Sequence, residues 1–207
     1  MADMDSQLPT TTRIEAFSDG VIAIIITIMV LDLKLPATII ETHSLPLIAG
    51  ILGPPLIGYA ISFMTISIAT LTHHTLMREA PFATTALYWW NALLLFCLSL
   101  VPLTTAAVGE HPTDPFAVAA FGAIFSLLAG AFALLHRYVA RLASVYKVAR
   151  RHSRAATKAD LIAVALYARA VPLAWVSVYL SYLIYIGVAA VYFLPIYGRE
   201  TAAVSKG

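Results

Sequence analysis

Long apolar runs dominate this chain and restrict the folds that are open to it. Of its 207 residues, 60% are hydrophobic and only 12% are charged, and the mean hydropathy is +0.85. A soluble domain carries about 25% charged residues, whereas a membrane-crossing helix needs about 20 mostly apolar residues. The sequence therefore predicts an all-α membrane protein, folded as a single domain over residues 1–207.

Six apolar segments approach or exceed the length of a transmembrane helix. The last two come from one stretch of 38 residues, which we divide at a turn within 177–181; one long tilted helix is the competing interpretation. We expect Pro54 and Pro55 to kink the second span, and Gly122 and Gly130 to admit close neighbours in the fourth. The predicted spans are residues 14–33, 46–70, 85–105, 115–136, 160–177 and 180–197.

The distribution of charge predicts the orientation. Seven Lys or Arg lie within residues 137–158, a segment that we expect to extend the fourth helix into water and to attract anionic membrane lipids. Lys and Arg in short loops favour the cytoplasm, and six spans place this segment, both termini and the loop holding Arg78 on that side. We therefore expect a multi-pass plasma-membrane protein with cytoplasmic N- and C-termini.

The first span carries polar side chains at its entrance. A carboxylate such as Asp19 is costly in hydrocarbon and needs partners. The simpler interpretation is an N-terminal charge that complements the helix dipole, with Arg13 as a positive anchor. We favour a structural network that fixes the first helix against its neighbours. Its predicted members are Arg13, Phe17, Ser18, Asp19, His73, His74 and Asn91.

This entrance also resembles a known signature. The residues RIEAFSDG, which begin at Arg13, resemble the RxxxFSD motif of the endolysosomal potassium channel family and its prokaryotic homologues. The similarity continues through GVIAIIITIMVLDLKLP. The histidine pair at 73 and 74 and the stretch WWNALLLFCLSLVP are weaker echoes of the family's second and third helices. The resemblance covers about half of the chain.

The resemblance implies a fold and an assembly. Members of this family have six transmembrane helices, and their prokaryotic forms are homotetramers in which the first helix lines a central pore for potassium ions. They lack the TVGYG filter, which is also absent from this sequence. Bulky aliphatic residues and a threonine layer form their constriction. The matching positions here are Ile24, Thr27 and Leu31.

Helical phase places these residues on one stripe. At about 100° per residue, Leu31 lies about 20° from Ile24 around the helix, Ile28 and Gly20 about 40°, and Thr27 about 60°. Without the resemblance, the aliphatic residues would be read as lipid-facing or packing side chains, and the Thr27 hydroxyl as bonded to a carbonyl one turn back.

The same phase separates the acidic residue from the stripe. Asp19 falls about 140° from Ile24, so we expect it to turn back into the bundle. Arg169, inside the fifth span, is expected to pair with a carboxylate such as Asp160 or with a carbonyl. Adjacent residues on a helix point about 100° apart, which argues against a metal shared by His73 and His74.

These observations favour a potassium-permeable channel with a hydrophobic constriction, which gates by dewetting and gives modest selectivity. The alternative is a proton-coupled transporter that uses Asp19 and His73 or His74; a membrane scaffold without flux is a third hypothesis. No GxSxG, HExxH, P-loop or GxGxxG motif occurs, so we expect neither an enzyme nor a cofactor or metal. The basic segment lacks interleaved aromatic residues and does not predict nucleic-acid binding.

Overall fold

The computed structural model describes residues 10–31, 33, 45–146 and 153–204, and within them it contains helices and no strand. Four helical stretches in this part are long and apolar enough to cross a membrane: Thr12–Leu31, Pro46–Glu79, Thr85–Glu110 and Pro115–Val145. The described part of the chain is therefore all-helical, and its apolar helices are those of a multi-pass membrane protein. The elements are α1 (Thr12–Leu31), α3 (Leu45–Glu79), α4 (Thr85–Ser99), α5 (Val101–Glu110), α6 (Pro115–Val145), α7 (Ser153–Leu173) and α8 (Val178–Val204).

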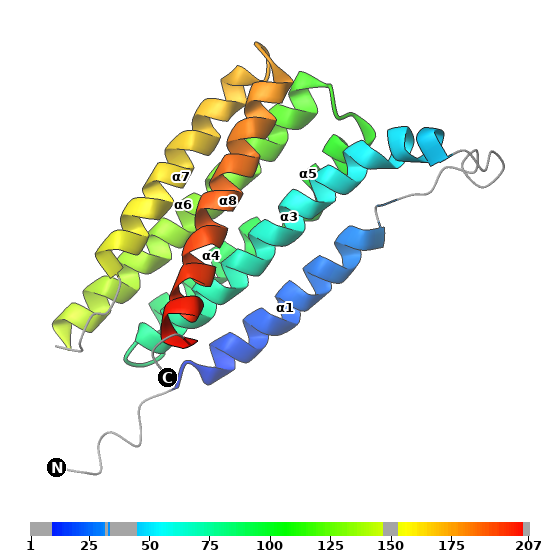
Figure 1. Cartoon of the computed structure of the whole chain (residues 1–207). Coiled ribbons are helices and arrows are strands. Elements are labelled where there is room, and N and C mark those ends of the chain that lie inside the picture. The colour runs from blue at the N-terminus through cyan, green and yellow to red at the C-terminus, as the bar shows by residue number, and fades with distance from the viewer. Residues whose placement is uncertain (1–9, 32, 34–44, 147–152, 205–207) are drawn as a thin grey trace, which may run out of the picture.

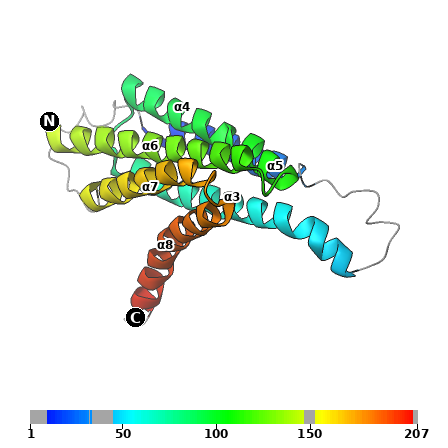
Figure 2. The ribbon, with the colours of Figure 1, turned by 90° about the horizontal axis from the view of Figure 1, so that it is seen from above.

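The helices run roughly side by side, with α1 at one edge of the bundle and α7 toward the other (Figure 1). On its inner side α1 packs against α3 and α4, and α6 packs against α4 and α7. The start of α1, the end of α3 and the end of α6 lie at the same end of the bundle (Figure 1). Seen from above, α8 diverges from the other helices toward its C-terminal end (Figure 2).

The predicted third span is two helices in line. The expected range of 85–105 corresponds to α4 followed by α5, which continues to Glu110, and Leu100 lies between them. Pro102 sits in the first turn of α5. Proline has no backbone N–H and is tolerated in the first turn of a helix, but it interrupts a helix interior. The break therefore follows from Pro102, which hydropathy alone does not register.

The prediction for the basic segment is confirmed only in part. We expected residues 137–158 to extend the fourth helix, and α6 does continue beyond residue 136. It ends at Val145, however, and α7 already begins at Ser153; residues 147–152 lie outside the described part. The α7–α8 turn comes earlier than the expected 177–181, because the Ser177 amide closes it by donating to the Leu173 carbonyl at 2.8 Å.

A glycine sets the contact between α6 and α8. The Tyr185 hydroxyl donates to the Val118 carbonyl at 2.8 Å, and a Cβ at Gly122 would collide with that hydroxyl. Gly130, which we expected to play the same part, has no neighbour within 4 Å of a Cβ position. Only Gly122, of these two, serves close packing. Pro54 lies inside α3, whose N-terminal part runs in a different direction from the rest (Figure 1).

Candidate functional site

Helix α1 has one buried face and one exposed face. The exposed fractions of Ile24, Ile28 and Leu31 are 58%, 47% and 75%, and Gly20 and Thr27 are exposed as well. The center of this stripe lies opposite the buried face, as the helical phase requires. An apolar stripe that the single chain leaves uncovered is available to line a pore or to contact another copy. The buried residues of α1 are Ile14, Ser18, Ile22, Ile25 and Met29.

The Thr27 hydroxyl is bonded within its own helix. Its Oγ1 lies 3.0 Å from the Ala23 carbonyl oxygen and 2.9 Å from that of Ile24. Because the single hydroxyl proton is directed at these carbonyls, the lone pairs of Oγ1 remain free on the exposed side. Thr27 is therefore bonded to the backbone one turn back, which was the simpler interpretation. This bond still allows its oxygen to face a cation.

A buried polar chain joins three helices at the entrance of α1. Ser18 donates to the Ile14 carbonyl at 2.8 Å and accepts from Nδ2 of Asn91 at 2.9 Å. Oδ1 of Asn91 lies 2.7 Å from Nε2 of His73. Ser18 is 0% exposed, and Asn91 and His73 are each 1% exposed. Polar groups buried to this degree stabilise a structure only when they are paired.

The hydrogen bonds from Ser18 through Asn91 to His73 fix the tautomer of His73. The carbonyl oxygen of Asn91 can only accept, so Nε2 of His73 must carry the proton. Its other ring nitrogen, Nδ1, is buried and has no hydrogen-bond partner among the described residues. The three side chains come from α1, α3 and α4, and they hold α1 at a defined rotation about its axis.

Asp19 occupies a different position from the one we expected. It does not turn into the bundle: its side chain is 47% exposed and lies 3.3 Å from Nε2 of His74, which is 33% exposed. The buried polar residue is its neighbour Ser18. One position along a helix changes direction by about 100°, which is enough to move a side chain from the interior to the edge.

The other predicted members of the network lie outside the polar chain. The Phe17 ring is 50% exposed and stacks on Tyr88 with 6.4 Å between ring centroids. Arg13 is exposed and makes no hydrogen bond or ion pair with the residues that the structure describes. The structure thus brings Ser18, Asn91 and His73 together, pairs Asp19 with His74, and leaves Arg13 apart.

A second polar cluster was missed by sequence reasoning. Nδ1 of His136 lies 2.6 Å from Oδ2 of Asp160, and both side chains are 6% exposed. The Tyr192 hydroxyl donates to Oδ1 of the same carboxylate at 3.3 Å. We expected Arg169 to pair with a carboxylate such as Asp160 or with a carbonyl, but Arg169 is exposed, and Asp160 contacts His136 and Tyr192 instead. The available signal was an isolated acidic residue at the start of an apolar stretch; its partner on α6 is 24 residues away.

The described residues contain no group of three or more His, Cys, Asp or Glu that could hold a metal ion. The adjacent rings of His73 and His74 lie 6.2 Å apart between centroids, at an interplanar angle of 70°. Their nitrogens serve Asn91 and Asp19 separately. The observed contacts at the α1 entrance join α1 to α3 and α4.

Known proteins resemble this chain in sequence and in structure. The family described as endosomal/lysosomal potassium channel TMEM175 matches residues 13–102. A protein of Chamaesiphon minutus, named as a potassium channel, is 35% identical over 177 residues, which cover 83% of this chain and 87% of that one. This chain belongs to the TMEM175 potassium channel family. It is thus a member of a family of channels, which are not enzymes.

A solved structure extends the similarity beyond the matched region. The crystal structure of a homologue of the lysosomal potassium-selective channel TMEM175, from Chamaesiphon minutus, superposes with a TM-score of 0.77 at 33% identity. It covers 89% of this chain, whereas the family match ends at residue 102, within α5. The family fold therefore includes most of the helices that follow α5.

An animal relative is matched over a shorter part of its length. The human protein named endosomal/lysosomal proton channel TMEM175 is 32% identical over 157 residues, which cover 68% of this chain but 31% of the human one. The family names therefore include both a potassium channel and a proton channel. The matched region 13–102 contains the α1 stripe and the Ser18–Asn91–His73 chain, whereas His136 and Asp160 lie outside it.

Proposed function

We propose that this protein is a potassium-permeable channel in which four copies place α1 around a central pore. The observation that carries the proposal is the uncovered stripe of α1, where Ile24 is 58% and Leu31 is 75% exposed although the opposite face is buried. We infer potassium as the permeant ion from the names of the relatives, which are called potassium channels. Potassium would pass by diffusion, without a cofactor.

The stripe has a chemistry that suits a gate. Rings of Ile24 and Leu31 cannot coordinate an ion, but they control whether water and its dissolved ion enter the constriction. Thr27 lies between them and has free oxygen lone pairs on the exposed side. Ile28 and Gly20 complete the stripe, and Gly20 widens its mouth because it has no side chain. We expect modest selectivity, set mainly at Thr27.

The assembly that we propose has six spans in each subunit. Thr85–Glu110 counts as one span, and α7 and α8 supply the fifth and sixth beside the four that qualify by length and hydropathy. This even number agrees with N- and C-termini in the cytoplasm of a plasma-membrane protein. The Ser18–Asn91–His73 chain and the Asp19–His74 pair then act as structural anchors for the pore helix.

Planar-bilayer recording tests the proposal. Purified protein is expected to pass potassium current in discrete steps, and Ile24→Asn is expected to raise the open conductance several-fold, because an amide removes the barrier to wetting. The matched control is Val30→Asn, which changes a side chain of the same helix that is 47% exposed and lies about 120° from Ile24. Its open conductance should stay at the wild-type value.

Two results would contradict the channel. One is current indistinguishable from protein-free membranes in both the wild type and Ile24→Asn. The other is saturable, pH-driven uptake that lacks single-channel steps and disappears in Asp19→Asn. The second result would favour a proton-coupled transporter, which the contact between Asp19 and His74 makes the relevant competitor.

A further inference from the structure

Helix α6 has one face that the rest of the chain leaves largely uncovered. Along this face the residues recur at alternating steps of four and three, the spacing that keeps side chains on one side of a helix. None of them belongs to the buried residues of α6, and Phe116, Leu127 and Leu134 are 73%, 57% and 43% exposed. The helices α4 and α7 lie on either side of α6 (Figure 2). We call this face the α6 stripe; its members are Phe116, Ala120, Ala123, Leu127, Gly130, Leu134, Arg137 and Arg141.

The chemistry of the α6 stripe changes between Leu134 and Arg137. Every member up to Leu134 is apolar or glycine, and the last two are Arg137 and Arg141. Both arginines are exposed, and neither makes a hydrogen bond or ion pair with the residues that the structure describes. Two like charges four residues apart on a helix repel each other. An anion that binds both guanidinium groups would relieve this repulsion.

The length of the apolar part matches the thickness of a bilayer. At 1.5 Å rise per residue, Arg137 lies about 32 Å from Phe116 along the helix axis, and the hydrocarbon core of a bilayer is about 30 Å thick. At the Phe116 end, Asp114 caps the helix by accepting from the Phe116 amide. Arg137 therefore lies at the opposite boundary of the hydrocarbon, and Arg141 lies about 6 Å farther out, at the level of the lipid headgroups.

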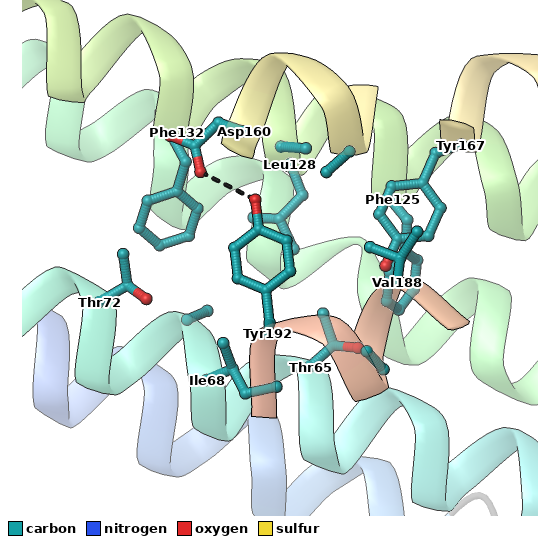
Figure 3. Close-up of a pocket in the computed structure, with 14 residues that line it drawn as sticks. Thr65, Ile68, Thr72, Phe125, Leu128, Phe132, Asp160, Tyr167, Val188 and Tyr192 are labelled. Atoms are coloured by element: carbon teal, nitrogen blue, oxygen red, sulfur yellow. Dashed lines mark hydrogen bonds between the residues drawn. The ribbon is translucent and has the colours of Figure 1, made fainter. Parts of the chain in front are cut away.

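The helices around the stripe do not balance the charge of its arginines. Helices α4 and α6 contain no Asp or Glu, and the acidic residue of α7 is Asp160. Asp160 is buried and contacts His136 and Tyr192. Its carboxylate borders a pocket that buried side chains of α6 line, among them Phe132 (Figure 3), and it is therefore on the side of α6 away from the stripe. The positive charge of the arginines remains available to an anion from outside the chain.

A phospholipid matches both parts of the stripe. Its phosphate accepts the paired N–H groups that a guanidinium presents in a fixed fork. Its acyl chains need apolar surface over half of the bilayer core, and Leu127 lies about 15 Å from Arg137 along the axis. Between them, a Cβ at Gly130 meets nothing within 4 Å, which leaves room for a chain against the helix. A free phosphate ion would use the arginines but not the apolar surface.

We propose that the α6 stripe is a binding site for one anionic phospholipid. The phosphate lies between Arg137 and Arg141, and one acyl chain follows Leu134, Gly130 and Leu127 toward the middle of the bilayer. The sequence predicted attraction of anionic lipids by the whole segment 137–158, and the site is narrower: one face of α6, shared by two arginines and the apolar residues before them. It is separate from the α1 stripe and does not depend on the channel function proposed above.

Native mass spectrometry of the full-length protein in detergent tests the site. The protein is titrated with phosphatidylglycerol and, as the probe without net charge, with phosphatidylcholine of the same acyl chains. Phosphatidylglycerol should bind about tenfold more tightly, because each nearby arginine favours an anionic lipid. The double variant Arg137→Gln/Arg141→Gln should lose this preference. The control Arg78→Gln, which removes an exposed arginine at the end of α3, should retain it.

Three results would overturn the proposal: equal binding of the two lipids to the wild type, an undiminished preference in the double variant, or an equal loss in Arg78→Gln. The last would mean that the basic end of the bundle attracts lipids without a defined site. If the double variant does not fold, the single variants Arg137→Gln and Arg141→Gln should each lose part of the preference, and an unchanged preference in both would contradict the site.

Two further measurements test the apolar half of the site. Glycerol 3-phosphate, which has the charge but no acyl chain, should not displace phosphatidylglycerol at equal concentration. Displacement would show that the arginines bind free phosphate and would overturn the lipid. Leu134→Gln keeps both arginines and changes a side chain that is 43% exposed. It should weaken phosphatidylglycerol binding several-fold, and unchanged binding would contradict the placement of the acyl chain.

Discussion

At the residue scale, Asn91 determines whether the buried polar groups at the entrance of α1 have hydrogen-bond partners. Its amide is the only group among the described residues that contacts both Ser18 and His73. An amide offers donors and an acceptor at the same time, which is why this position can join a hydroxyl to an imidazole N–H. A carboxylate would lack the donor, and a hydroxyl would be too short to reach both partners.

Asn91→Leu should therefore lower stability substantially. The substitution preserves volume approximately but leaves the Nε2–H of His73 buried without an acceptor, at a cost of about 1–3 kcal/mol. Ser18 keeps its bond to the Ile14 carbonyl and loses only the hydrogen bond from Asn91. Thermal unfolding of the purified protein in detergent measures the loss as a lower midpoint. The control is Thr75→Val at an exposed, back-bonded threonine, where a surface change should stay within about 0.5 kcal/mol. Equal midpoints for the two variants would show that the polar chain contributes little.

At this scale, the sequence predicted which residues lie near one another at the entrance of α1, but not which of them are in contact. It named Ser18, Asp19, His73, His74 and Asn91 from chemical type, because polar groups in an apolar helix need partners. It could not decide which of two adjacent residues is buried, since about 100° of helical phase separates them and the direction of the bundle is unknown from sequence. The structure assigns the interior to Ser18 and the edge to Asp19.

At the element scale, the approach of α8 to α6 depends on the absence of one side chain. The Tyr185 ring is 0% exposed and cannot swing aside, and its hydroxyl occupies the space that a Cβ at Gly122 would need. The two glycines of α6 differ in this respect, although both lie in the same apolar helix. They form a matched pair for substitution.

Gly122→Ala is expected to destabilise the protein, whereas Gly130→Ala should stabilise it or have no effect. At Gly130 a Cβ meets nothing within 4 Å, so the change gains the helix propensity of alanine, up to about 1 kcal/mol. At Gly122 the same gain is outweighed by the displacement of Tyr185 and the loss of its bond to Val118. Thermal midpoints of both variants check the prediction. A stabilised Gly122→Ala protein would mean that α8 separates from α6 easily.

Element boundaries were predictable only where a residue marks them. The break at Leu100 had its signal in Pro102, and the N-terminus of α6 in Asp114, whose side chain accepts from the Phe116 amide. The contact of His136 with Asp160 had no local signal, because it depends on the register between two antiparallel helices. Hydropathy locates apolar segments, but it contains no information about that register.

At the scale of the whole molecule, the exposed stripe of α1 is the surface that an oligomer must use if the pore proposal is right. We expect Leu31→Cys, in a Cys97→Ala background, to cross-link neighbouring copies with a short bifunctional maleimide. Leu31 is 75% exposed, and the control Leu127→Cys alters an α6 side chain that is 57% exposed. A denaturing gel should show cross-linked bands for Leu31→Cys only. Equal cross-linking at both positions would contradict the proposal that α1 lies at the center of the oligomer.

The whole-molecule prediction rested on resemblance more than on periodicity. Every face of α1 is apolar beyond its entrance, so composition could not distinguish a pore-lining stripe from a lipid-facing one. Hydropathy did predict the membrane class and the four long spans, because each is a continuous apolar run. Assembly involves other copies of the chain, and no local sequence pattern indicates where those copies lie.

The polar chain is attached near one end of α1, so it would act as the pivot if this helix tilted. Ser18 is tied near one end of the helix, while Leu31, at the other end, is 75% exposed. At 1.5 Å rise per residue, Leu31 lies about 20 Å from this pivot and Ile24 about 9 Å. A tilt of about 5° would therefore move Leu31 by nearly 2 Å and Ile24 by less than 1 Å. If four copies place α1 around a pore as we propose, a ring at Leu31 would widen first and over the larger range, and a ring at Ile24 would be the stiffer restriction.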